Sequence, residues 1–293
     1  MNQNISIIGG DLRIVKLAEL LEAENFKVAI YAMDEAESIN KLNSIKKCDT
    51  IQECIKQAEV IVGPVPLSSN GIDINTPFSD KKITVKELIP LLTGKTFIAG
   101  AIKSEVLKLA EENGVTVIDL MAREELAVLN TISTAEGAIQ IAMEETPRTI
   151  HGSNVLVMGF GRVGKILSNM LNGIGAHVYC EARKDTDLAW IKAYGYHAIS
   201  LKDLDKELEK FDVIINTIPA VVLNEEKLQQ LKKECLLIDL ASHPGGVDKQ
   251  AAKKLGIKLI WALSLPGKVA PITSAEFIKE TLINILKDIE TKA

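Results

Sequence analysis

The feature that most constrains the fold is a glycine pattern directly after an apolar segment. Residues 155–158 read Val-Leu-Val-Met, and Gly159, Gly161 and Gly164 follow with the spacing Gly-x-Gly-x-x-Gly. In a dinucleotide-binding turn, the first glycine permits a tight turn and the second lets the backbone approach a pyrophosphate. The third lets the next helix pack closely on the strand. The pyrophosphate then lies at the positive N-terminus of that helix.

The flanking residues decide whether these glycines mark more than an ordinary turn. Apolar residues at three-to-four spacing predict a helix over 162–172, and residues 176–181 predict the next strand. Strand, turn, helix and strand fit within the roughly 30 residues of a βαβ unit. The segment therefore predicts a cofactor site that includes Phe160, Arg162 and Val163 beside the three glycines.

Length and composition bound the architecture. A chain of 293 residues that is 47% apolar exceeds the usual size of one domain and suffices for two cores. We expect an α/β fold with two doubly wound parallel-sheet domains joined by crossover helices, the second being a Rossmann dinucleotide-binding domain. The predicted boundaries are 1–130 with 274–293 for an N-terminal substrate domain, and 131–273 for the cofactor domain.

Charge and cysteine usage exclude several classes of function. The net charge is −5 with both signs interspersed, which argues against nucleic acid or an anionic membrane as the partner. The four cysteines form no CxxC pair and no cluster with histidine, so we expect free thiols and no metal site. No apolar run approaches the roughly 20 residues that span a bilayer. We expect a cytoplasmic protein.

A second βα unit begins the chain. Residues 5–8 predict a strand, Gly9-Gly10-Asp11 a turn, and residues 12–21 a helix that Asp11 caps. Arg13 lies where small ligands bind at the end of a sheet, either as a solvated residue or as an anion contact. The loop after the strand at 59–63 contains Ser68 and Ser69, which form either a surface turn or a set of donors to a carboxylate.

A long helix is predicted between the domains, because Ala135, Ala138, Ile139 and Ala142 share one face. Arg123, Thr134 and Glu136 would then border a cleft.

Three segments follow the predicted strands of the cofactor domain. Near-continuous apolar strands end at Asn216 and at Asp239, as buried parallel strands do. Another strand, at 258–261, precedes a Pro-Gly-Lys-Val segment at 266–269. We expect further cofactor contacts from these strand ends, namely Thr217, Ile218, Pro219, Ala241, Ser242, Pro266, Gly267 and Val269.

The end of the second strand discriminates between the two dinucleotides. An acid there accepts from the ribose 2′-hydroxyl of NAD, whereas arginine or lysine meets the 2′-phosphate of NADP. Glu181 lies at about the spacing that admits NAD. Ala182, however, occupies the position where relatives of this fold carry the acid, and Arg183 and Lys184 follow it. These residues favour NADP over NAD, with Arg183 and Lys184 on the 2′-phosphate and Ala182 as a further cofactor-binding position.

An ordered set of motifs identifies a family. The motifs are the stretch from Ala122-Arg123 to Asn130, Thr134-Ala135-Glu136-Gly137-Ala138, His151-Gly152-Ser153-Asn154 leading into Gly159-Phe160-Gly161-Arg162, Asn216-Thr217-Ile218-Pro219, residues 239–246 (Asp-Leu-Ala-Ser-His-Pro-Gly-Gly) and residues 265–271 (Leu-Pro-Gly-Lys-Val-Ala-Pro). Together they resemble the A-subunit family of dipicolinate synthase from spore-forming bacteria, which is related in fold to alanine and 2-hydroxy acid dehydrogenases. Pro271 replaces an arginine of the alanine dehydrogenases, which weakens that alternative.

The resemblance implies an NADP-dependent oxidoreductase that forms dipicolinate from a dihydrodipicolinate-type precursor of the lysine pathway, in the mother cell during sporulation. It also implies that the flavoprotein-like B-subunit of dipicolinate synthase is the partner, and we expect an oligomer. The substrate is a small dicarboxylate, for which Arg13, Ser68, Ser69, Arg123 and Thr134 are the candidate contacts.

The candidate catalytic residues are His243, Lys268 and Arg123, with His243 the best-placed proton acceptor. Two alternatives remain open at this point. One is a 2-hydroxy acid or alanine dehydrogenase, and the other is a regulatory protein that binds NADP and activates a partner enzyme.

Overall fold

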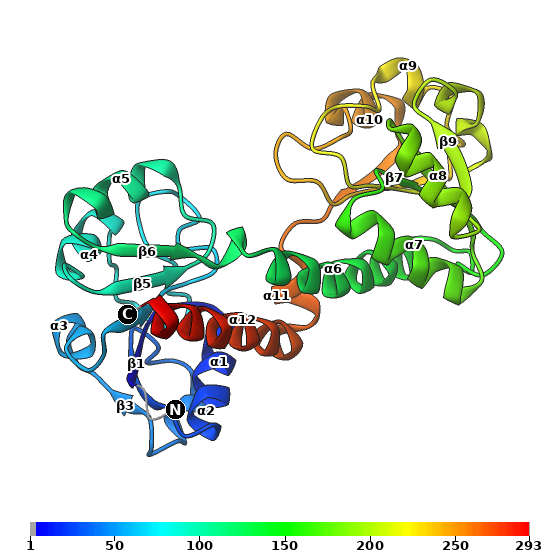
Figure 1. Ribbon diagram of the computed structural model, residues 1–293. Helices are drawn as coiled ribbons and strands as arrows, with labels where there is room; N and C mark the ends of the chain where they lie inside the picture. Colours follow the sequence, from blue (N-terminus) through cyan, green and yellow to red (C-terminus); the bar gives the residue numbers. More distant parts are fainter. Residues whose placement is uncertain (1–3, 293) are drawn as a thin grey trace. The chain divides into compact units, whose positions relative to one another are not determined.

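The structure is a computed structural model that describes residues 4–292 (Figure 1). The chain divides into two compact units, one made of the described residues up to Ala127 and from Ala270 onward, the other of Val128–Val269. The first boundary falls within helix α6 (Glu124–Glu145), and the second falls between α11 (Leu265–Val269) and α12 (Pro271–Lys292). No helix formed by residues 4–292 combines the length and apolar character that crossing a bilayer requires.

The first unit is built on a six-stranded sheet with the order β3-β2-β1-β4-β5-β6. All pairs are parallel, with Ile5 opposite Val28 on one side and Val60 on the other. The carboxyl ends of the strands therefore lie along one edge. The strands are β1 (Asn4–Ile8), β2 (Lys27–Tyr31), β3 (Lys46–Lys47), β4 (Val60–Val62), β5 (Thr96–Ala99) and β6 (Thr116–Asp119).

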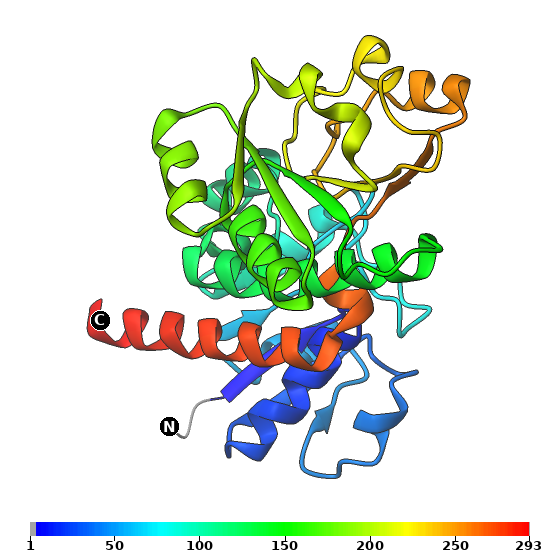
Figure 2. The same ribbon diagram turned by 90° about the vertical axis from the view of Figure 1, so that its right-hand side faces the viewer.

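Two apolar layers cover the two faces of this sheet. Ile5 and Ile7 pack on one face with residues of α1 (Leu12–Ala23) and α12, which lie side by side (Figure 2). Ile8 and Phe97 face the other layer, which α3, α4 and α5 complete. The alternation follows from the two-residue period of a strand. The remaining helical segments of this unit are α2 (Glu37–Asn40), α3 (Ile51–Ile55), α4 (Val85–Leu91), α5 (Ser104–Glu112) and the 3₁₀ turn η1 (Leu120–Ala122).

The second unit repeats this plan. Its parallel sheet has the order β12-β11-β10-β7-β8-β9, with β7 at the point where the strand order reverses. Such a switch point is where ligands bind in open α/β sheets. The strands are β7 (Asn154–Met158), β8 (His177–Ala182), β9 (His197–Ser200), β10 (Val213–Asn216), β11 (Leu236–Asp239) and β12 (Lys258–Trp261).

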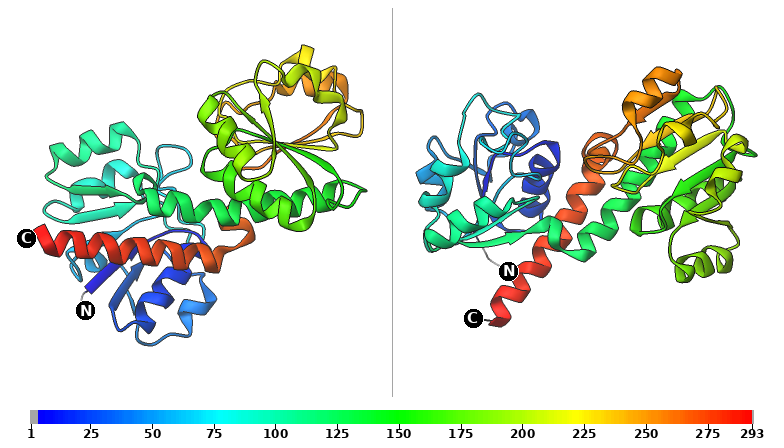
Figure 3. Two further views of the ribbon diagram at one scale, coloured as in Figure 1. Left: turned by 45° about the vertical axis from the view of Figure 1, so that its right-hand side comes forward. Right: turned by 90° about the horizontal axis from the view of Figure 1, so that it is seen from above.

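Helices cover both faces of this sheet as well. Figure 3 shows the green helices α6 and α7 (Arg162–Ile174) on one face, where α8 (Asp185–Ala193) contributes Ile191 to the same apolar cluster. The other face carries residues of α9 and α10. The remaining helical segments are α9 (Glu225–Leu228), α10 (Lys249–Leu255), η2 (Leu204–Lys206) and η3 (Leu208–Lys210). Two parallel sheets flanked by helices confirm the predicted α/β class.

Candidate functional site

The glycine turn between β7 and α7 needs two of its glycines for reasons within the protein. Gly159 has a φ of +88°, and a Cβ on it would lie 2.6 Å from Oγ1 of Thr217. A Cβ on Gly164 would lie 2.0 Å from the carbonyl oxygen of Gly159. A side chain at Gly159 would therefore clash with Thr217, and a side chain at Gly164 would clash with the backbone of the turn itself.

Gly161 differs from both, because the protein itself leaves room for a side chain there. A Cβ on Gly161 would meet nothing within 4 Å, and its φ of −82° is open to any residue. Gly161 is also the N-cap of α7, and it makes no side-chain cap hydrogen bond. The open space at the N-terminus of this helix fits a dinucleotide pyrophosphate.

A buried polar pair shapes the two loops beside this turn. Asn216 and Asp239 are opposite each other at the ends of β10 and β11, and the Asn216 amide donates to Asp239 Oδ1 over 2.8 Å. Asn216 Oδ1 accepts from the amide of Ile218, and Asp239 Oδ2 accepts from the amide of Gly246. Asp239 Oδ1 also accepts from the Ala241 amide. These bonds fix the loops that carry the predicted cofactor residues from Thr217 to Pro219 and at Ala241 and Ser242.

At the end of β8, the carboxyl group of Glu181 is buried, whereas Arg183 and Lys184 are exposed. Val178, Cys180 and Ala182 pack in the cluster beneath α7, whereas Tyr179 packs on the other face. Strand alternation places Glu181 with Tyr179. Its side chain is fully buried and neither carboxyl oxygen has a hydrogen-bond partner within residues 4–292, so burial raises the pKa of Glu181.

Arg183 and Lys184 are exposed at the same strand end, and Lys184 is the N-cap of α8. Their charged groups are therefore accessible from solvent, unlike the carboxyl group of Glu181.

His243 lies in the loop after β11 and is exposed. Its ring centroid is 6.1 Å from that of Trp261, whose indole nitrogen donates to the carbonyl of Ala241 over 2.8 Å. Trp261 thus ties the His243 loop to the end of β12. Lys268 is exposed within α11, and the predicted cofactor residues Pro266, Gly267 and Val269 of the same helix are half-buried.

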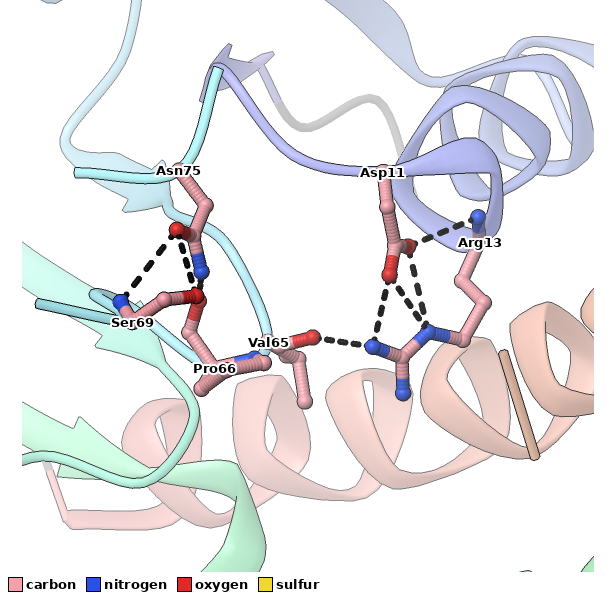
Figure 4. A network of polar contacts seen from close by, with 6 residues as sticks. All are labelled: Asp11, Arg13, Val65, Pro66, Ser69 and Asn75. Carbon is pink, nitrogen blue, oxygen red and sulfur yellow. Dashed lines mark hydrogen bonds and ion pairs between the residues drawn. The ribbon is translucent and has the colours of Figure 1, made fainter. Parts of the chain in front are cut away.

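In the first unit, Arg13 contacts the loop that follows β4. Asp11 caps α1 and also accepts from Arg13 Nε and Nη2, the latter over 2.7 Å (Figure 4). Arg13 Nη2 donates in addition to the carbonyl of Val65. Its other terminal nitrogen, Nη1, has no hydrogen-bond partner in the described part of the chain. Arg13 is only 8% exposed, and its guanidinium is held in place with one donor group left over.

Ser68 and Ser69 lie in the same loop and bond within it. Ser69 Oγ donates to Asn75 Oδ1 over 2.9 Å, and Asn75 Nδ2 donates to the carbonyl of Pro66 over 2.7 Å (Figure 4). Ser68 Oγ donates to Asn70 and accepts from the amide of Gly71. The loop after β4 thus carries both serines, and Arg13 of α1 contacts the same loop at Val65.

Arg123 and Thr134 are engaged elsewhere. The Arg123 guanidinium pairs with Glu125 at 2.7 Å and with Asp288 of α12 at 2.8 Å, and both carboxylates raise the pKa of Arg123. A substrate carboxylate would have to compete with both. Thr134 Oγ1 donates to the carbonyl of Asn130 within α6, and Glu136 is exposed on the same helix.

Several residues that organise these sites are absent from the sequence-based candidates. Asn216 and Asp239 showed a signal, since each ends a buried apolar strand with a polar side chain. Asn75 and Trp261 showed none, because each acts through a contact with a loop distant in sequence. Within residues 4–292, no three His, Cys, Asp or Glu side chains gather in a group that could hold a metal ion.

Each of the two units matches a known protein family. Residues 4–121 match the family described as the N-terminal domain of the dipicolinate synthase A-subunit. Residues 126–254 match "D-isomer specific 2-hydroxyacid dehydrogenase, NAD binding domain". The second match supports an oxidoreductase with a nicotinamide dinucleotide cofactor.

Whole-chain relatives agree. The chain is 30% identical to the dipicolinate synthase A-subunit of Bacillus subtilis (strain 168) over 98% of its own length and 97% of the relative's. The crystal structure of the dipicolinate synthase A-subunit from Bacillus halodurans superposes with a TM-score of 0.87 at 30% identity, covering 97% of each chain. An L-alanine dehydrogenase structure shares the fold alone, with a TM-score of 0.68 at 13% identity over 99% of this chain and 90% of its own. This chain therefore belongs to the A-subunit family of dipicolinate synthase.

Proposed function

We propose that this chain is an NADP-dependent oxidoreductase that forms dipicolinate from a dihydrodipicolinate-type precursor. Family membership carries the proposal, because the full-length relative is named for that product and the coverage is nearly complete on both sides. Two physical features support it: a glycine turn with room for a pyrophosphate at Gly161, and a partly free guanidinium at Arg13 in the other unit.

The choice of NADP rests on the end of β8. An NAD site needs a carboxylate that reaches the ribose hydroxyls. Glu181 is buried on the opposite face of the strand from Ala182, so its carboxyl group is withdrawn from that role. Arg183 and Lys184 are exposed and offer a forked donor and a point charge to a 2′-phosphate.

The dicarboxylate would bind in the first unit, at the carboxyl edge of the sheet. Arg13 is oriented by Asp11 and Val65, so little side-chain freedom is lost when Nη1 meets a carboxylate. Ser68 and Ser69 lie in the same loop, and their hydroxyl groups, which donate to Asn70 and Asn75, would have to turn toward the ligand to bind it.

The chemistry required of the protein is modest. Oxidation of the dihydropyridine ring releases one hydride and one proton, and the gain of aromaticity drives the step. The bound dinucleotide supplies hydride acceptance. His243 takes the proton, because it is an exposed imidazole at a strand end and Trp261 and Asp239 fix its loop. Lys268, a point charge on α11, adds electrostatic attraction for the anionic substrate.

The family name implies a second, non-identical polypeptide, and we extend the proposal to the flavoprotein-like B-subunit as partner. Formation of dipicolinate would place the enzyme in the cytoplasm of the mother cell of a spore-forming bacterium.

The test is to incubate the purified chain with NADP⁺ and freshly generated dihydrodipicolinate, and to follow NADPH absorbance and dipicolinate together. We expect equal amounts of both products. Activity that requires addition of the partner polypeptide would instead indicate a regulatory NADP-binding role. Turnover of a 2-hydroxy acid or alanine without turnover of dihydrodipicolinate would contradict the proposed substrate.

A further inference from the structure

We propose that Lys103 is the second carboxylate-binding cation of the first unit, opposite Arg13 across the loop after β4. The inference rests on the proposed dicarboxylate substrate and names the residue that would hold its second carboxylate. Lys103 follows β5 at the carboxyl edge of the sheet and is exposed. Four observations in this unit support the assignment.

The first observation is that the loop after β4 lies between two neighbouring strand ends. On the β1 side, the amide of Gly10 donates to the carbonyl of Asn75 over 2.9 Å. On the β5 side, the amide of Leu67 donates to the carbonyl of Gly100 over 2.7 Å, and the Gly100 amide donates to Pro64 over 3.0 Å. The loop therefore has a fixed place, with Arg13 contacting it from one side and the segment of Lys103 from the other.

The second observation is the position of the ammonium group. A Cβ on Gly71 would lie 2.9 Å from Lys103 Nζ, so the amine lies against the tip of the serine loop. Gly71 has a φ of +79°, and its amide donates to Ser68 Oγ. The ammonium group is thus beside the loop whose hydroxyl groups are the proposed donors.

The third observation is that Lys103 has no partner for its charge. Within residues 4–292, its Nζ has neither a hydrogen bond nor an ion pair with a carboxylate. Many lysines of this chain do pair, as Lys81 does with Asp34 and Lys95 with Glu59. The ammonium group of Lys103 is therefore available to an anionic ligand.

The fourth observation is the strained turn that precedes Lys103. Ala101 has a φ of +54°, a conformation that is costly for a residue with a side chain. Asp119, at the end of β6, stabilises it by accepting from the amides of Ala101 at 3.0 Å and Ile102 at 2.9 Å. A supported strained turn is a common way to present a functional side chain.

These features match the chemistry of a ligand with two carboxylates. Arg13 offers Nη1 from a guanidinium that is already oriented, and Lys103 offers a flexible point charge. A ligand with one carboxylate needs only Arg13. Lys103 should therefore discriminate between pyridine-2,6-dicarboxylate and pyridine-2-carboxylate.

The experiment measures dissociation constants of both compounds for the full-length chain by calorimetry in metal-free buffer. We expect Lys103→Met to weaken binding of the dicarboxylate about tenfold, as for the loss of one charge-assisted contact. The dissociation constant of the monocarboxylate should change by less than about threefold. Lys103→Arg should restore most of the loss. Lys108→Met, at an exposed position further along α5, is the matched control and should change neither constant.

The outcomes separate this inference from the proposed function. If Lys103→Met behaves like Lys108→Met while Arg13→Gln weakens both ligands, the dicarboxylate site stands and Lys103 is only a surface lysine. If Lys103→Met weakens both ligands equally, its role as the second of two cations is wrong. If the unmodified chain binds neither compound, both the inference and the proposed substrate fail. Circular dichroism of each variant confirms that it is folded.

Discussion

Gly161 and Gly164 belong to the same turn, but substituting them should have opposite effects on stability and on ligand binding. A Cβ on Gly164 would approach the backbone oxygen of Gly159 to 2.0 Å, and a backbone oxygen cannot move aside as a flexible side chain can. A Cβ on Gly161 would meet nothing within 4 Å. Gly164 is therefore required by the packing of α7 on β7, whereas the space at Gly161 is free for a ligand.

We expect Gly164→Ala to lower the free energy of unfolding by about 1–3 kcal/mol, as overpacking does. Gly161→Ala should cost at most about 1 kcal/mol, the difference between glycine and alanine at an N-cap. It should nevertheless weaken NADPH binding at least about tenfold, or 1.4 kcal/mol. Urea unfolding and nucleotide fluorescence measure the two quantities, and normal NADPH affinity in Gly161→Ala would argue against the pyrophosphate at this turn.

Arg183 provides the test of cofactor choice. We expect the native protein to bind NADPH more tightly than NADH, because an exposed guanidinium forms a forked contact with a 2′-phosphate. Arg183→Glu should weaken NADPH binding at least about tenfold and leave NADH affinity nearly unchanged. Nucleotide fluorescence titration checks both constants. A native preference for NADH would show that the cofactor assignment is wrong.

Glu181 makes stability depend on pH. Burial raises its pKa in the folded state, and the backbone amide of Gly159 and the charge of Arg183 oppose this only in part. Between the ordinary carboxyl pKa and the raised value, the folded state binds more protons than the unfolded state, so its contribution to stability falls as pH rises. Glu181→Gln should therefore stabilise the protein more at pH 8 than near pH 5 in urea unfolding. A gain that is equal at both pH values would mean that Glu181 is not protonated on folding.

The same residue marks a limit of sequence reasoning. Spacing placed Glu181 where an NAD-binding acid is expected, and only strand alternation against neighbouring clusters showed which face it occupies. The cations Arg183 and Lys184 were readable because they follow the strand directly. Ion pairs between residues distant in sequence, such as Arg123 with Asp288, cannot be read from the sequence.

At the scale of elements, periodicity predicted the long helices and the buried strands well. The 12 residues of α1 and the 13 of α7 carry full apolar stripes, and β10 and β11 are apolar up to their last, polar residue. Short elements carry too few periods to be recognised, such as the two residues of β3 and the five of α3. They form because the sheet and its covering layers hold them, not because of local preference.

Helix α12 illustrates an element whose stability comes from packing. Ile278, Leu282 and Ile285 are at most 1% exposed and lie in the cluster that α1 and β1 share. We expect Leu282→Ala to lower the free energy of unfolding by about 2–5 kcal/mol. Lys287→Ala, on the exposed side of the same helix, should change it by less than about 0.5 kcal/mol. Circular dichroism during urea unfolding provides both values, and equal effects would contradict the packing of α12.

At the scale of the whole molecule, each unit has its own sheet and two apolar layers of its own. Their sequences are connected through α6 and through the segment between α11 and α12. Unfolding of one unit therefore need not coincide with unfolding of the other. Both tryptophans of the chain, Trp190 and Trp261, lie in the second unit. Their fluorescence reports on that unit alone, whereas far-ultraviolet circular dichroism reports on both.

This difference between probes allows each ligand to be assigned to a unit. A ligand that binds only a folded unit stabilises it by about 2.7 kcal/mol at a hundred times its dissociation constant. We expect NADPH to shift the tryptophan fluorescence transition to higher urea. Dipicolinate should shift part of the circular dichroism transition more than it shifts the fluorescence transition, because Arg13 lies in the unit without tryptophan. Gly161→Ala should abolish the first shift only, and Arg13→Gln the second only. If dipicolinate moved the fluorescence transition and did so equally in Arg13→Gln, the dicarboxylate would be binding without Arg13 and the proposed site would be wrong.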